Sequence, residues 1–333
     1  MIRRIALLCV VLAAPLFGQT TLNGAGATFP NPMYQKWFSE YHKAHPEIQF
    51  NYQSIGSGGG IRQVLAQTVD FGASDGPMTD EQLSQAKVKI LHIPTVLGAV
   101  VPAYNVPGVS GELKFTPEAL SGIFLGKITS WNDPAIAKAN PGVNLPNQTI
   151  VLIHRSDGSG TTYIWTDYLS KISSEWQNGP GKGTSVKWPV GLGGKGNEGV
   201  AGMIRQMQGG IGYIELIYAV QNKIDYGSVK NASGAFVKAS LESVTAAAAS
   251  APKMPADFRV SITNPPGKEA YPISSFTWLL IPEKSKEAGK GKILADFLTW
   301  MVDDGQRMTA DLTYAPLPGN VAEKVKGAIR LVQ

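Results

Sequence analysis

Residues 155–161, Arg-Ser-Asp-Gly-Ser-Gly-Thr, combine a fixed positive charge with hydroxyl groups and accessible backbone amides, the groups that bind anions. The apolar residues 150–153 before this segment predict a short strand, and residues 163–169 after it predict a helix. The loop would then lie at the carboxyl end of a strand and the amino end of a helix, where free N–H groups and the helix dipole favour an oxyanion. Taken alone, the same residues also fit a flexible turn.

Three similar loops precede this one in the chain. Residues 24–29 include Thr28, residues 54–60 contain Ser57 before three consecutive glycines, and Asp75 follows the predicted strand 71–74. A predicted helix comes after each loop, and the last of these helices opens with the capping-box pattern Thr79-Asp80-Glu81-Gln82. This repeated order of strand, loop and helix predicts an α/β protein with mostly parallel sheets and ligands at the carboxyl ends of the strands.

Two long apolar strands, predicted at residues 96–104 and 271–281, bracket the middle of the chain. Between them lie short predicted helices at residues 116–118 and 133–134, the anion-binding loop, a glycine-rich stretch at 179–196 and a predicted helix at 197–208. Two such strands favour two lobes joined by two crossings, as in binding proteins that bend at a hinge.

The amino terminus differs in composition from the rest. Residues 1–18 have a basic start, an apolar run from residue 5 to residue 17 and a small residue at Gly18, which predicts a cleaved secretory signal. The only cysteine, Cys9, lies in this segment and is a poor lipidation site, so we expect a free protein outside the cytoplasm with no disulfide. Without Arg3 and Arg4 the formal charge is about +3, too small to indicate a nucleic-acid partner.

The sequence lacks the common enzyme motifs that a sequence alone can reveal. Ser57 and Ser159 lack the glycine two residues earlier that a nucleophile elbow requires, no phosphate loop or dinucleotide fingerprint is complete, and the four histidines form no metal cluster with carboxylates. We therefore expect no catalysis, metal or cofactor.

Arg155 could donate to two oxygens of a bound anion, whereas an ionised Asp75 can only accept. Such a site favours an anion that carries a proton, as phosphate does near neutral pH and sulfate does not.

Seven segments of the chain together resemble one protein family, the periplasmic phosphate-binding proteins of ABC-type high-affinity phosphate importers. The similarity covers essentially the whole chain after the signal. The segments are residues 24–30 (GAGATFP), 55–60 (IGSGGG), 69–75 (VDFGASD), 128–134 (ITSWNDP), 155–161 (RSDGSGT), 210–215 (GIGYIE) and 314–318 (YAPLP).

The resemblance implies a role for each matching residue. Asp75 would accept the phosphate proton, and Asp157 would hold Arg155 in place. The other phosphate contacts would come from Thr28, Phe29, Ser57, Arg155, Ser159, Gly160 and Thr161. The family often has a second serine where this chain has Gly58, and we expect this difference to matter little because Ser57 makes the contact.

The fold implied by the resemblance is the type II periplasmic-binding-protein fold, with two lobes that are each a mostly parallel sheet flanked by helices. Lobe I would comprise residues 19–102 and 275–333, and lobe II residues 103–274. The expected partners are inorganic phosphate and the membrane permease subunits of an ABC importer, and we expect a monomer. Three alternatives stay open: a binding protein for another oxyanion such as sulfate, a secreted hydrolase, and a phosphate scavenger or sensor without a permease.

Overall fold

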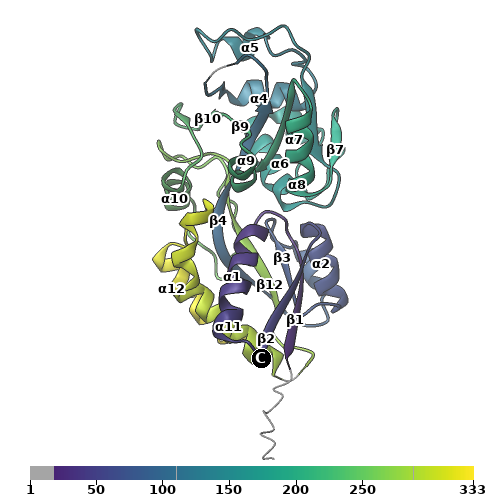
Figure 1. Ribbon diagram of the computed structural model, residues 1–333, viewed down its shortest axis with the longest axis vertical. Helices are drawn as coiled ribbons and strands as arrows, with labels where there is room; N and C mark the ends of the chain where they lie inside the picture. The colour runs from purple at the N-terminus through teal and green to yellow at the C-terminus, as the bar shows by residue number, and fades with distance from the viewer. Residues whose placement is uncertain (1–18, 110, 288) are drawn as a thin grey trace, which may run out of the picture.

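A mixed β-sheet runs through the whole protein. The structure is a computed structural model that describes residues 19–109, 111–287 and 289–333, so the expected signal at residues 1–18 lies outside it. Within these residues the sheet has nine strands in the order β2-β1-β3-β12-β4-β8-β6-β7, with β9 paired beside β4, and a three-stranded sheet has the order β11-β10-β5. Figure 1 shows the elements in a lower and an upper group.

The lower group contains the first three strand–loop–helix units. Its strands are β1 (Thr20–Gly26), β2 (Ile48–Ser54) and β3 (Phe71–Ser74), and its first helices are α1 (Asn31–Ala44), α2 (Ser57–Ala66) and α3 (Asp80–Ser84). Strand β1 pairs in parallel with β2 and β3, as predicted. The lower group is completed by α11 (Lys290–Asp303) and α12 (Gly319–Ile329), which pack beside β4 and β12 (Figure 1).

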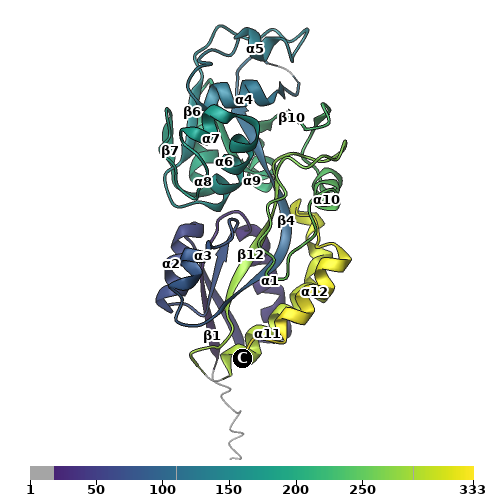
Figure 2. The same cartoon turned by 180° about the vertical axis from the view of Figure 1, so that it is seen from behind.

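The upper group begins after β4 and contains most of the shorter elements. Its elements are β5 (Lys114–Phe115), α4 (Pro117–Phe124), α5 (Pro134–Ala137), β6 (Val151–Arg155), α6 (Gly160–Ile172), α7 (Ser174–Asn178), β7 (Leu192–Gly194), α8 (Gly196–Gln206), β8 (Gly210–Glu215), α9 (Leu216–Asn222), β9 (Asp225–Tyr226), β10 (Ser228–Lys230) and β11 (Phe236–Val237). Strand β6 pairs in parallel with both β7 and β8. Helix α10 (Leu241–Ala249) lies to one side, beside the junction of the groups (Figure 2).

Strand β4 (Ile90–Asn105) belongs to both groups. Its first part pairs antiparallel with β12 (Ser274–Pro282), and its second part pairs antiparallel with β8. The strand predicted at residues 96–104 is therefore only the second part of a longer strand that begins at Ile90. A register shift opposite Thr277 and Trp278 lets one continuous strand bend at Thr95, as a β-bulge does. The antiparallel β4 and β12 also make the sheet mixed at its centre, while both sides are parallel as predicted.

Helices α2 and α6 begin earlier than predicted, at Ser57 and Gly160 instead of Ile61 and Tyr163. The consecutive glycines 58–60 therefore form the first turn of α2 and are not a loop. A Cβ on Gly60 would lie 2.6 Å from the carbonyl oxygen of Ala25, so the missing side chain lets the helix pack directly on β1. This close packing brings the start of α2 to the end of the strands.

Aromatic side chains form the core of each group. In the lower group the aromatic side chains on one face of α1, including Trp37 and Tyr41, are buried. In the upper group the ring of Tyr213 stacks on that of Trp165 with centroids 5.3 Å apart. This ring contact packs α6 against β8 in the upper core.

Candidate functional site

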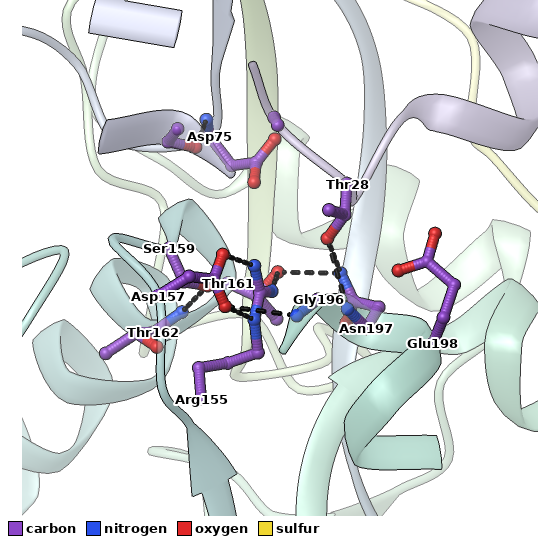
Figure 3. A network of polar contacts seen from close by, with 12 residues as sticks. Thr28, Asp75, Arg155, Asp157, Ser159, Thr161, Thr162, Gly196, Asn197 and Glu198 are labelled. Carbon is purple, nitrogen blue, oxygen red and sulfur yellow. Dashed lines mark hydrogen bonds and ion pairs between the residues drawn. The ribbon is translucent and has the colours of Figure 1, made fainter. Parts of the chain in front are cut away.

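The predicted site residues come together between the lower and upper groups (Figure 3). From the lower group, Thr28 follows the end of β1, Ser57 begins α2 and Asp75 follows the end of β3. From the upper group, Arg155, Ser159 and Thr161 lie where β6 ends and α6 begins. All six are buried, and none exposes more than 3% of its surface. The loops also touch directly, because Gly58 N–H donates to the carbonyl oxygen of Gly158 at 2.9 Å.

Arg155 is held by two neighbours of its own loop. Its Nε and Nη2 donate to the two carboxylate oxygens of Asp157 at 2.8 and 2.5 Å, and its Nη1 donates to Thr161 Oγ1 at 3.3 Å. Burial would raise the pKa of Asp157, but the hydrogen bonds and charge of Arg155 overcome this and hold the pKa below its usual value. Because a guanidinium has five N–H groups, each terminal nitrogen of Arg155 keeps one N–H for a ligand.

Asp75 lies on the opposite side of the site from Arg155 (Figure 3). Its Oδ1 accepts from Thr277 Oγ1 at 2.8 Å, and its buried Oδ2 has no hydrogen-bond partner within the described residues. Burial raises the pKa of Asp75 to about 7, opposed in part by the Thr277 hydrogen bond and the charge of Arg155. A buried oxygen without a hydrogen-bond partner lowers the stability of the folded protein, and a donor group on a bound ligand would satisfy it.

Backbone N–H groups at two helix starts complete the donor set. Ser57 is the first residue of α2, and Gly160 and Thr161 form the first turn of α6, where N–H groups have no partner within the helix. The positive ends of both helix dipoles therefore meet at the site. Ser159 caps α6 by accepting from Thr162 N at 3.0 Å, which leaves its own hydroxyl hydrogen free to donate.

Thr28 and Phe29 differ in how they can contribute. The Thr28 hydroxyl lies at the contact between the groups, whereas the Phe29 ring is buried beside Tyr314, with centroids 6.3 Å apart. Only the backbone of Phe29 can therefore face a ligand. His154, one of the four histidines, stacks on Trp188 with ring centroids 4.8 Å apart.

The predicted site omits three polar residues that the structure places against it. Asn197 at the start of α8 donates through Nδ2 to Thr28 Oγ1 at 2.8 Å and to Thr161 Oγ1 at 3.1 Å. Thr277 supports Asp75, and the Tyr213 hydroxyl accepts from Arg155 N at 3.1 Å. The sequence signal for Tyr213 was its place in the matching segment 210–215; Asn197 and Thr277 carried no local signal.

Glu215, in the same segment, is a second buried carboxyl group near the site. Its Oε2 accepts from Ile217 N at 2.7 Å and so caps α9, while its buried Oε1 has no hydrogen-bond partner within the described residues. Burial raises the pKa of Glu215 well above its ordinary value. By contrast, Trp131 of the matching segment 128–134 is buried in the upper core and donates to Gly209 O at 3.0 Å, away from the site residues.

This arrangement can bind a small anion that carries a proton. Arginine, hydroxyl and amide donors surround one side, and a single carboxylate oxygen that needs a donor faces them. In the described part of the chain, no group of three or more His, Cys, Asp or Glu residues could hold a metal ion. A search of the same residues for a helix with the length and hydropathy of a membrane span finds none.

A family model and individual known proteins resemble this chain over most of its length. A model of the PBP superfamily domain matches residues 13–305. The chain is 47% identical over 308 residues to the phosphate-binding protein PstS of Pasteurella multocida, covering 92% of this chain and 89% of that protein. It is 37% identical over 338 residues to PstS of Methanocaldococcus jannaschii, covering 92% and 85%.

Solved structures share the fold at lower identity. A high-affinity periplasmic phosphate-binding protein (PfluDING), solved with bound phosphate, superimposes with a TM-score of 0.76 at 23% identity, over 92% of this chain and 93% of that chain. An ABC-type phosphate transport receptor from Vibrio cholerae superimposes with a TM-score of 0.57 at 16% identity, over 89% and 100%.

Proposed function

The chain belongs to the PBP superfamily and, within it, to the PstS phosphate-binding proteins, and from this membership we infer that it binds inorganic phosphate for an ABC phosphate importer. It is a transport receptor with the α/β periplasmic-binding-protein fold and not an enzyme. We propose that it works outside the cytoplasm, in the periplasm, as a monomer that delivers phosphate to the membrane permease subunits.

The proposed phosphate cage consists of the converging residues of both groups. Its ligands are Thr28, Phe29, Ser57, Asp75, Arg155, Ser159, Gly160 and Thr161, with Asp157 as the support of Arg155. One observation carries the proposal: the Oδ2 of Asp75, which has no hydrogen-bond partner among the described residues, faces Arg155 and the start of α6 in a buried site (Figure 3). That combination fits an anion with both a negative charge for the donors and a proton for Asp75.

We propose that the lower and upper groups are two lobes that close on the ligand. The proposed boundaries, 102/103 and 274/275, fall within β4 and at the start of β12, the two long strands that lead from one group to the other. Strand β4 changes its pairing partner from β12 to β8 between Ala99 and Val100, three residues before the first proposed boundary, and a bend at that change would leave the sheets on both sides intact. The buried site and the direct contact of Gly58 with Gly158 correspond to the closed arrangement.

Calorimetric titration of the secreted form tests this function. We expect tight phosphate binding at pH 8 and little competition by sulfate. Arg155→Ala should weaken phosphate binding by about 3–5 kcal/mol, because a buried anion loses its charge partner. Arg307→Ala is the control, since that side chain is 81% exposed and its partner Asp304 is also on the surface.

Two results would count against the proposal. A loss below about 1 kcal/mol for Arg155→Ala, the size of a surface ion pair, would place the binding site elsewhere. Equal affinity of the unaltered protein for sulfate and phosphate at pH 8 would remove the role given to Asp75.

A further inference from the structure

Asn197 is fully buried and joins the two groups at the site (Figure 3). It belongs to the first turn of α8 in the upper group, and Thr28 belongs to the loop after β1 in the lower group. Both the backbone N–H and the Nδ2 of Asn197 donate to Thr28 Oγ1, at 3.2 and 2.8 Å. With its second hydrogen, Asn197 Nδ2 donates to Thr161 Oγ1, and the two atoms are 3.1 Å apart.

The orientation of the Asn197 amide is set by the backbone. Glu215 N–H can only donate, and it lies 2.9 Å from Asn197 Oδ1. The other end of the amide must therefore be the NH₂ group, which can only donate to the two threonine hydroxyls. Asn197 uses its acceptor on β8 and both of its side-chain donors on the ligand-binding loops.

These contacts decide the direction of the two hydroxyl hydrogens. A hydroxyl has one donor hydrogen and two acceptor positions. Thr28 Oγ1 accepts twice from Asn197, and Thr161 Oγ1 accepts from Asn197 and from Arg155 Nη1. With both acceptor positions filled, each hydroxyl can only donate to a further group, and in a buried site that group is the ligand.

We propose that Asn197 is a positioning residue for phosphate binding: it commits the Thr28 and Thr161 hydroxyls to donate to the anion, and it does so fully only when the two groups meet. This inference rests on the proposed function. Because the Thr28 contact crosses between the groups, opening the cleft removes it and frees the Thr28 hydroxyl to turn away. Asn197 thus couples closure to the strength of the anion site.

A double-mutant cycle tests whether Asn197 acts through the hydroxyls. Phosphate affinity is measured by calorimetry for Asn197→Ala in the unaltered protein and in a Thr28→Val/Thr161→Val background. We expect Asn197→Ala to weaken binding about 10- to 100-fold alone, because two charge-assisted hydrogen bonds lose their orientation. In the valine background the same change should cost less than about threefold, since no hydroxyls remain to orient. The exposed Asn144→Ala serves as the matched control.

Asn197→Asp provides a second variant of nearly the same size. The aspartate still accepts from Glu215 N–H but presents an oxygen to the threonine hydroxyls, which would then donate to it and not to phosphate. We expect a loss larger than that of Asn197→Ala. Thermal unfolding without phosphate checks that both variants fold.

The outcomes separate this inference from the proposed function. If the unaltered protein fails to bind phosphate, the proposed function is wrong. If it binds and Asn197→Ala matches Asn144→Ala, or costs the same factor in both backgrounds, the positioning role of Asn197 is wrong. A large loss that nearly vanishes in the valine background supports it.

Discussion

At the scale of single residues, Asp75 is the group that would distinguish the proposed phosphate site from a general anion site. Sequence reasoning treated Asp75 as ionised and able only to accept. In the structure, burial raises its pKa to about 7, so the carboxyl group itself exchanges a proton near neutral pH. A bound phosphate and Asp75 can then share one proton, whichever of them brought it.

Sulfate binding should consequently depend on pH. Above pH 7, Asp75 is ionised and offers no donor to sulfate; below pH 7 it gains a proton and can donate one. We expect sulfate affinity to rise about tenfold between pH 8 and pH 6, because one proton is taken up on a group with a pKa of about 7. Competition titrations of sulfate against phosphate at several pH values measure this change.

Asp75→Asn is the matched variant, since its amide donates at every pH. Its sulfate affinity should not vary between pH 6 and pH 8, and its preference for phosphate should be reduced. A sulfate affinity of the unaltered protein that does not change over this range would contradict the role of the Asp75 proton.

At the scale of elements, the start of α6 must approach the lower group very closely. A Cβ on Gly160 would lie 2.4 Å from Ser57 Oγ and 2.5 Å from Asp75 Oδ2, closer than real side chains come. Gly160→Ala should therefore keep the groups apart and cost about 1–3 kcal/mol of phosphate binding, as overpacking does. Calorimetry gives the affinity, and thermal unfolding without phosphate should show no loss of stability.

Gly202→Ala in α8 is the control for helix propensity. No atom lies within 4 Å of the position of its added Cβ. We expect unchanged phosphate affinity and a gain in stability of about 0.5–1 kcal/mol. If both alanine variants bind phosphate equally well, α6 does not come as close in solution as the structure shows.

The buried Glu215 side chain, which caps α9, should make the stability of the protein depend on pH. Because the folded pKa of Glu215 is raised, the folded state holds more protons than the unfolded state above the ordinary glutamate pKa, and stability falls as pH rises. Glu215→Gln keeps the cap without the titration. We expect the unfolding free energy of Glu215→Gln to improve relative to that of the unaltered protein as the pH rises from 5 to 7. Urea unfolding at pH 5, 6 and 7 measures the difference, and a constant difference would contradict it.

At the scale of the whole molecule, the sheet connects the groups through β4 and β12 while the buried site lies between them. A ligand that binds both groups should stabilise the closed arrangement. We expect the radius of gyration from small-angle X-ray scattering to decrease on adding phosphate. The Arg155→Ala variant, tested at the same phosphate concentration, should not contract. An unchanged radius for the unaltered protein with bound phosphate would contradict the hinge.

Local patterns in the sequence were sufficient for the elements that carry the site. Alternating apolar strands and polar loops predicted β1 to β3 and β6, and the capping residue Thr79 predicted the start of α3, which the structure confirms with a full capping box. Helix starts at Ser57 and Gly160 were missed. Their glycines look like loop residues until the strand or loop packed against them is known.

By itself the sequence determined the donor-rich loop 155–161, because its fixed charge, hydroxyl groups and backbone amides all lie within seven consecutive residues. Tertiary structure alone decided the pKa of Asp75, the pairing of Thr28 with Asn197 and the burial of Glu215. These depend on water removed by residues far away in the chain, and on contacts between groups separated by more than a hundred positions. A short sequence pattern does not show which distant residues will pack against it.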